Sequence, residues 1–245
     1  MKKPQKVRID TLVLAKGLAS SRQKAQALIM TGNVLVEGRV VDKAGKEVAP
    51  DSVITIKETL PFVSRGGLKL AGFLDERKLD VAGLAVMDVG SSTGGFTDCL
   101  LKRGAKKVYA VDVGKGILDV SLRNDPRVVV LEERNIRHMD TTDVGELVDL
   151  AVIDVSFISL EKVLPKVKEF LKEGGRVLAL IKPQFEVGKG QVGKGGIVKD
   201  PEKHRAVVER IREFSVENGY SVVGAGESPI TGAKGNREFW IDLLA

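Results

Sequence analysis

The stretch Asp88-Val89-Gly90-Ser91-Ser92-Thr93-Gly94-Gly95-Phe96 decides the fold of this 245-residue chain. Apolar residues 85–89 predict a buried strand and residues 96–101 predict the start of a helix, so the glycines lie at a strand-to-helix corner. Glycines at such a corner let backbone amides approach a ligand at the carboxyl end of a sheet. The alternative is a tight structural turn, and the glycine loop alone does not separate the two interpretations.

The order of the glycines narrows the ligand. A dinucleotide-binding loop has the pattern G-x-G-x-x-G, whereas this loop has G-x-x-x-G-G behind an acidic residue, Asp88. Asp112 ends the next apolar run, residues 108–111, where a carboxylate can accept both hydroxyls of a ribose.

This pattern resembles the first motif of S-adenosylmethionine-dependent methyltransferases. The resemblance implies S-adenosylmethionine as the cofactor, and Asn135 joins its expected contacts because it follows the third strand. The expected contacts are Asp88, Gly90, Ser91, Ser92, Thr93, Gly94, Gly95, Phe96, Asp112, Asn135 and Asp154.

Composition indicates a chain with a large core. An apolar content of 43% over 245 residues gives room for one large domain, or for one large and one small domain. The single cysteine, Cys99, cannot form an internal disulfide and is better explained as a buried helix residue than as a nucleophile. The basic residues 1–10 have no apolar run behind them, which argues against a signal peptide or membrane span. We therefore expect a cytoplasmic protein with no membrane partner.

The net charge of +6 lies entirely at the front of the chain. Residues 1–57 hold 11 Lys or Arg and 5 Asp or Glu, whereas residues 58–245 hold 28 of each kind. A basic module joined to a charge-balanced domain is expected if the first binds a polyanion and the second performs chemistry. A solvated lysine-rich face is the plainer alternative.

Residues 7–57 predict two short helices and a hairpin. Asp10 is expected to cap a first helix that Gly17 ends. Ser20 and Gln23 predict a capping box for a second helix that Gly32 ends. Alternating valines on both sides of Glu37-Gly38 predict the hairpin, and the side chains of three basic residues are expected on one exposed side: Arg8, Arg22 and Lys24.

This segment resembles the RNA-binding module of a primary small-subunit ribosomal protein and of many pseudouridine synthases. The resemblance follows the spacing of Arg8, Gly17, the Ser20-Ser21-Arg22 run, Gly32 and the valine-rich hairpin. It implies recognition of structured RNA by shape and phosphate contacts, consistent with an aromatic content of only 4% for base stacking.

The rest of the chain alternates strands and helices, as a doubly wound parallel sheet requires. Seven strands are expected, over residues 85–89, 107–112, 128–132, 148–154, 176–181, 220–225 and 238–244. Helices are expected near residues 68–79, 93–103, 116–123, 160–172 and 201–218. The fold class predicted is α/β, a Rossmann-like seven-strand methyltransferase domain preceded by a small α+β domain. The glycine- and lysine-rich loop 188–196 follows a strand end, which favours a mobile lid over a disordered connector.

Four charged residues need an explanation beyond the fold. Asp154 and Lys182 each follow an apolar strand, at the edge of the sheet where ligands bind. Glu238 begins the last strand, and Lys69 lies at the start of the second domain. Because burial and a neighbouring ammonium lower the pKa of a lysine, two lysines and two carboxylates in one cleft can move a proton. Each of the four taken singly is more often an ion-pair residue.

The order Lys69, Asp154, Lys182, Glu238 resembles the K-D-K-E tetrad of FtsJ-like ribose methyltransferases. Over nearly its full length the chain is similar to the TlyA family, in which a basic RNA-binding module precedes that domain. Four motifs carry the resemblance: Ser64-Arg65-Gly66-Gly67, residues 88–97, Asp154-Val155-Ser156-Phe157 and Lys182-Pro183-Gln184-Phe185-Glu186. We expect an RNA-binding domain over residues 1–58, a linker over 59–66 and a methyltransferase domain over 67–245.

The family resemblance implies an rRNA 2′-O-ribose methyltransferase that acts mostly on cytidine, with ribosomal subunits as partners and no metal. Lys182 would take the proton of the ribose 2′-hydroxyl, Asp154 and Glu238 would orient the two lysines, and Lys69 would hold the reacting groups. Arg65 is a further candidate for RNA binding. No Asn/Asp-Pro-Pro-aromatic string follows the fourth strand, which argues against an exocyclic amine as the target.

The sequence departs from the family in two places, and two other functional classes compete. Ser91 stands where alanine is frequent, and residues 59–62 lack the arginine-tryptophan pairing of some members. Because family members often carry the label haemolysin, a membrane-active protein is one alternative, but no apolar run reaches membrane length. The other is an RNA-binding assembly factor that has lost catalysis, against which the complete tetrad weighs.

Overall fold

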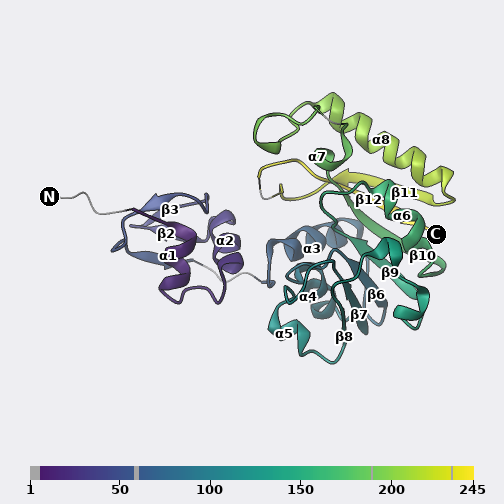
Figure 1. Ribbon diagram of the computed structural model, residues 1–245, viewed down its shortest axis with the longest axis horizontal. Helices are drawn as coiled ribbons and strands as arrows, with labels where there is room; N and C mark the ends of the chain where they lie inside the picture. Colours follow the sequence, from purple (N-terminus) through teal and green to yellow (C-terminus); the bar gives the residue numbers. More distant parts are fainter. Residues whose placement is uncertain (1–5, 58–60, 189, 233) are drawn as a thin grey trace. The chain divides into compact units, whose positions relative to one another are not determined.

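The computed structural model of the protein describes residues 6–57, 61–188, 190–232 and 234–245. The chain forms two compact units, Met1–Arg65 and Gly66–Ala245. Residues 59 and 60 of the expected linker lie outside the described residues. Each unit has its own strands and helices (Figure 1).

The first unit is a small α+β domain. Two helices, α1 (Ile9–Ala15) and α2 (Arg22–Met30), pack together over a core that includes Ile9, Val13 and Ile29. A three-stranded antiparallel sheet has the order β3-β2-β5, and β1 pairs with β4; their bounds are β1 Val7–Arg8, β2 Val34–Val36, β3 Arg39–Val40, β4 Glu47–Val48 and β5 Ile54–Ile56. The predicted hairpin forms, with Val36 opposite Arg39.

Both predicted helix caps of this unit are wrong by one or two residues. The N-cap of α1 is Arg8, because β1 runs directly into the helix and Asp10 lies in its first turn. The N-cap of α2 is Ser21, whose Oγ accepts a hydrogen bond from the backbone N–H of Lys24 at 3.2 Å. Either serine could cap this helix, and the extended backbone at Ser21 decides between them.

The second unit holds a seven-stranded sheet in the order β11-β12-β10-β9-β6-β7-β8. Strand β12 is antiparallel to both of its neighbours, and the strands from β10 to β8 are parallel to one another. The bounds are β6 Ala85–Val89, β7 Lys107–Val111, β8 Val128–Leu131, β9 Val148–Ile153, β10 Leu171–Ile181, β11 Ser221–Glu227 and β12 Phe239–Leu244. The predicted α/β fold class is confirmed.

Helices connect these strands, and α8 packs beside β11 (Figure 1). The α-helices are α3 Arg65–Arg77, α4 Gly95–Lys102, α5 Val120–Arg123, α6 Leu164–Lys168, α7 Pro183–Glu186 and α8 Pro201–Glu217. Short 3-10 turns are η1 Ile136–His138, η2 Thr141–Asp143, η3 Leu160–Lys162 and η4 Lys194–Gly196.

Two predicted helices are shorter than expected. Over residues 116–123 only α5 forms, because the backbone amides of residues 116–118 donate to the Glu132 carboxylate instead of forming helical hydrogen bonds. Over residues 160–172 the chain forms η3 and α6, and it enters β10 at Leu171, which pairs with Val148. Local propensity yields in both places to contacts with distant residues.

Candidate active site

The carboxyl ends of β6, β7, β9 and β10 converge at one edge of the sheet, and the glycine corner lies there. Gly90 has a φ of +85°, and a Cβ on it would lie 2.7 Å from the backbone oxygen of Asp154. Glycine therefore lets the end of β6 approach the end of β9. Gly94, with a φ of +93°, leaves room for the side chains of Leu118 and Leu122.

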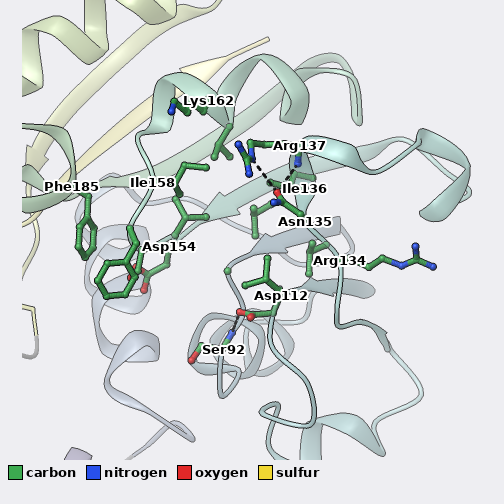
Figure 2. Close-up of a pocket in the computed structure, with 18 of the residues that line it drawn as sticks. Ser92, Asp112, Arg134, Asn135, Ile136, Arg137, Asp154, Ile158, Lys162 and Phe185 are labelled. Atoms are coloured by element: carbon green, nitrogen blue, oxygen red, sulfur yellow. Dashed lines mark hydrogen bonds between the residues drawn. The ribbon is translucent and has the colours of Figure 1, made fainter.

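A cleft of about 950 Å³ opens beside this corner (Figure 2). Five of the expected cofactor contacts line it: Gly90, Ser92, Asp112, Asn135 and Asp154. Six are not part of its lining: Asp88, Ser91, Thr93, Gly94, Gly95 and Phe96. The apolar part of the wall includes side chains that the sequence analysis did not single out, among them Ile117, Ile136 and Ile158.

Asp112 is the carboxylate at the centre of this cleft wall. Its Oδ2 accepts the backbone N–H of Ser92 at 2.8 Å and its Oδ1 accepts that of Gly114 at 2.7 Å. Figure 2 shows Asp112 directed toward Ser92. The carboxylate thus joins the glycine loop to the end of β7, and its remaining lone pairs can accept the hydroxyls of a ribose.

Asp88 holds the glycine loop from behind. The residue is fully buried, and its Oδ2 accepts the hydroxyl of Thr97 in α4 at 2.6 Å. Burial raises its pKa to about 7 against the lowering effect of the Thr97 hydrogen bond. Phe96 is buried as well and stacks on the ring of Trp240, with the ring centres 5.6 Å apart.

Asn135 lies where β8 gives way to η1. Its Oδ1 accepts the backbone N–H of Arg137 at 3.2 Å, which caps that turn, and the side chain faces the cleft beside Ile136 (Figure 2). Glu132 supports the part of the wall that includes Ile117, because its carboxylate accepts the backbone amides of residues 116–118. Arg123 and these amides lower the pKa of Glu132 to about 2.

The four charged residues of the predicted tetrad form two ion pairs. Lys182 Nζ lies 2.6 Å from Asp154 Oδ1, and Lys69 Nζ lies 2.5 Å from Glu238 Oε2. Both lysine side chains are 10% exposed. Burial favours the neutral acid of Asp154, yet Lys182 and then Lys69 outweigh it and hold the pKa of Asp154 below its usual value. The tetrad is therefore one electrostatic unit with a charged Asp154.

The loop after β9 contributes two cleft residues that the sequence analysis placed in a motif without giving them a role. Ser156 Oγ accepts a hydrogen bond from Lys182 Nζ at 3.1 Å. Phe157 has a φ of +63° and is 90% exposed, and its ring lies 4.8 Å from that of Phe185. A strained backbone that presents an aromatic ring to solvent is typical of a functional position. In the sequence, the signal that could have singled out Phe157 is its place three residues after Asp154, the acid at the end of a strand.

Glu186 fixes the far end of that loop. Its buried carboxylate accepts the Ser159 hydroxyl at 2.8 Å and the backbone N–H of Leu160 at 2.9 Å, and Arg210 of α8 donates to it at 3.0 Å. Burial raises the pKa of Glu186 despite these donors. The loop that carries Ser156 and Phe157 is thereby tied to α7.

In the first unit, two of the expected RNA-binding residues share one buried partner. Arg8 and Arg22 donate to the carboxylate of Asp10 at 2.9 and 3.1 Å, and their side chains remain 47% and 52% exposed. Lys24 and Arg65 are half-buried. The predicted exposed side therefore presents Arg8 and Arg22 most fully.

The predicted lid, of which residue 189 lies outside the described residues, is anchored at its end. Asn236 is buried, accepts the backbone N–H of Val198 at 3.0 Å and donates to the carbonyl of Gly196 at 2.9 Å. This ties the loop to the segment just before Glu238. Motion of the remaining loop stays a prediction. Among the described residues, no helix combines the length and the apolar character that a membrane crossing needs.

Comparison with known proteins gives matches over both units. The FtsJ-like methyltransferase family matches residues 62–243, and the S4 domain family matches residues 7–54. The chain is 46% identical over 98% of its length to YqxC, an rRNA methyltransferase candidate of Bacillus subtilis, covering 86% of that protein. It is 44% identical, again over 98% of its length and over 90% of the relative, to the 16S/23S rRNA (cytidine-2′-O)-methyltransferase TlyA of Mycobacterium tuberculosis.

A solved structure resembles the whole chain as well. The protein comes from Streptococcus thermophilus and is described as a candidate hemolysin. It has a TM-score of 0.78 and 43% sequence identity, over 99% of this chain and 89% of that one.

Proposed function

We propose that this chain, which belongs to the FtsJ-like methyltransferase family, methylates the 2′-hydroxyl of a ribose in ribosomal RNA. The observation that carries the proposal is the tetrad, in which two lysines and two carboxylates pair at the ligand edge of the sheet with no side chain more than 20% exposed. A fold has no need of four such charges in one place, because desolvation makes buried ion pairs poor contributors to stability. Cytidine is the proposed nucleotide, because the similar TlyA carries that specificity in its name.

S-adenosylmethionine is the proposed cofactor, and the cleft fits it. Asp112 would accept the ribose hydroxyls, the backbone at Gly90 would approach the amino-acid part, and Ile117 and Ile136 would flank the base. When bound, the cofactor supplies a methyl group activated by a sulfonium. Asp88 would act from behind, by holding the glycine loop through Thr97.

The residues of this chain would do three things for the reaction. Lys182, in its neutral form, would take the proton of the 2′-hydroxyl, and Asp154 would hold the ammonium that results. Lys69, positioned by Glu238, would add positive charge beside the reacting oxygen. Phe157 would stack on the nucleobase of the target. Alignment of the reacting groups then supplies most of the acceleration.

The first unit is the proposed anchor on RNA. Residues 1–57 carry the whole net charge of the chain, and the S4 domain family matches residues 7–54. Ribosomal subunits are the proposed partners because the relatives named above act on rRNA. In this division of labour the expected domains, residues 1–58 and 67–245, bind RNA and perform the chemistry respectively.

The test combines product mapping with cofactor binding. Incubation with isotope-labelled cofactor and isolated ribosomal subunits should give a 2′-O-methyl ribose at a defined cytidine. Asp112→Ala should weaken cofactor binding in calorimetry by about 1.5–3 kcal/mol, the value of hydrogen bonds to a charged group. Glu133→Ala is the matched control, because this exposed carboxylate pairs with Lys115. The proposal would be contradicted if the RNA of neither subunit became labelled, or if the label were found on a base.

A further inference from the structure

The proposed base and the cleft are separated by a hydroxyl. The Lys182 side chain is 10% exposed and is not among the residues that line the cleft, so its amine lies behind the cleft wall. Ser156 is exposed, lines the cleft, and accepts a hydrogen bond from Lys182 Nζ at 3.1 Å. This serine hydroxyl therefore connects the buried amine to the cleft proposed for the cofactor, where a substrate ribose would have to meet the methyl group.

We propose that Ser156 is a catalytic residue that relays the proton of the substrate hydroxyl to Lys182. The inference rests on the proposed function, because it assigns the route by which the ribose loses its proton. The 2′-O–H bond breaks and its proton goes to Ser156 Oγ, while the proton of Ser156 Oγ moves to the free pair of Lys182 Nζ. The ribose oxygen keeps the electron pair of its O–H bond and would bond with it to the methyl carbon, while the carbon–sulfur bond of the cofactor would break and leave its electron pair on a neutral thioether. Ser156 is unchanged at the end, and Lys182 holds the extra proton beside Asp154.

The loop has the rigidity that such a relay needs. At one end the backbone N–H of Asp154 donates to the carbonyl of Val89 at 2.9 Å. At the other end Glu186 accepts the Ser159 hydroxyl and the Leu160 amide. Ser156 is thus three residues or fewer from a fixed point on each side, and a relay depends on such fixed donor–acceptor distances.

A hydroxyl is also suited to this position by its chemistry. It donates one hydrogen bond and accepts two, so it can accept from the ribose while it donates to a neutral Lys182. In the structure it accepts from Lys182 Nζ, which is also the arrangement expected after the proton has arrived. The ribose oxygen, Ser156 Oγ and Lys182 Nζ can therefore stay hydrogen-bonded in the same order whether Lys182 is neutral or protonated.

The kinetic test uses Ser156→Ala and Ser156→Thr in the full chain with ribosomal subunits. Ser156→Ala should lower the single-turnover rate about 100-fold, at the lower end of what positioned proton transfer contributes, and leave cofactor and RNA affinity within about 3-fold. Ser156→Thr, which keeps the hydroxyl, should restore most of the rate. The matched control is Ser121→Ala, an exposed hydroxyl that contacts Asp119. In mixtures of light and heavy water, the wild-type rate should depend on the deuterium fraction as expected for two protons that move together. The rate of Ser156→Ala should depend on it as expected for one proton.

A second measurement needs neither cofactor nor RNA. Reductive methylation followed by mass spectrometry should label Lys182 faster in Ser156→Ala than in the wild type, because the hydroxyl no longer covers the amine, whereas Lys172 should be labelled equally in both. A Ser156→Ala rate within 3-fold of wild type, or a one-proton dependence in the wild type, would overturn the relay. In either case the wild-type protein would still make 2′-O-methyl ribose. Failure of the relay therefore differs from failure of the proposed function, in which the wild type makes none.

Discussion

The ion pairs of the two units differ in how far the cation beside the carboxylate is exposed. In the first unit, Asp10 is fully buried, but its partners Arg8 and Arg22 remain about half exposed. In the second unit, Asp154 and Glu238 pair with lysine side chains that are only 10% exposed, against 20% for Asp154 and 4% for Glu238. The cations of these ion pairs are therefore exposed to solvent in the first unit and largely buried in the second.

This difference in exposure matches the two tasks that we propose. A guanidinium held at one edge by Asp10 still offers its other N–H groups to a phosphate, and arginine keeps its charge at any physiological pH. A lysine withdrawn from water responds to nearby charges, because little solvent screens them. The first arrangement is suited to holding a polyanion, and the second to exchanging a proton.

The largest effect is expected where the buried pair does the chemistry. Lys182→Arg keeps the positive charge next to Asp154 but introduces a group that does not release its proton near neutral pH. The single-turnover rate of methyl transfer should fall about 1000-fold or more, and Lys182→Ala should fall similarly. Cofactor and RNA affinity should remain within about 3-fold of wild type. The control is Lys172→Arg, at an exposed pair with Asp149.

Substantial activity in Lys182→Arg would break the contrast between the two units. Lys182 would then be an electrostatic residue, like the arginines beside Asp10. The pH-rate profile separates the two cases, because loss of a titrating base removes the rise of the rate with pH, whereas loss of an electrostatic residue lowers the rate at every pH.

The sequence predicted the sheet better than its helices, for a physical reason. The strands β6, β7 and β9 are short apolar runs that are almost wholly buried, so their positions follow from composition. The 116–118 backbone is decided instead by Glu132, a residue 14 to 16 positions away, and no local pattern reveals that contact. The resemblance supplied the tetrad, and the structure shows its pairing, Lys182 with Asp154 and Lys69 with Glu238.

The cofactor contacts show the same limit. A motif marks a stretch of backbone and cannot say which side chains face the ligand. Asp88 and Phe96 belong to the motif, but both are buried behind the loop. Ser156 and Phe157 belong to a motif that the sequence analysis identified. That their side chains line the cleft could be seen only from the structure of the loop after β9.

A second test measures how much stability is lost when Glu238 is left without the cation that pairs with it. Lys69→Met removes the partner of Glu238 and should lower the free energy of unfolding of the second unit by about 3–5 kcal/mol, the cost of breaking a buried pair. The double variant Lys69→Met/Glu238→Leu should recover much of this loss, because no lone charge remains. Urea unfolding monitored by the fluorescence of Trp240 gives both values. Equal losses in the single and double variants would show that packing, not charge, dominates at this site.

A smaller effect is expected at Asp10, where solvent screens the arginines. Asp10→Asn should cost about 1–2 kcal/mol, the value of a few partly screened hydrogen bonds, measured by amide hydrogen exchange in α1 and α2. Hydrogen bonds from Arg8, Gln26 and Arg22 lower the pKa of Asp10 below its ordinary 3.8 despite its burial. Because the folded-state pKa is depressed, this stabilisation is present above about pH 4 and is lost as the pH falls further. Asp10→Asn should therefore flatten the acid limb of the stability curve of the first unit, and an unchanged acid limb would count against the ion pairs.

The smallest effect, and the most direct test of the exposed arrangement, is at Arg8. Asp10 neutralises about one of the two guanidinium charges, so the pair offers a phosphate about one net charge. Arg8→Ala should therefore reduce the slope of log affinity for rRNA against log salt by about one phosphate contact, and Arg22→Ala by a similar amount. The double variant Arg8→Ala/Arg22→Ala should lose at least the sum of the two, because Asp10 then leaves an unpaired negative charge in the same place. Lys16→Ala, which removes an exposed charge at the end of α1, is the matched control. If both arginine variants keep the wild-type slope, the arginines serve Asp10 alone, and exposure of a paired cation is not sufficient for RNA binding.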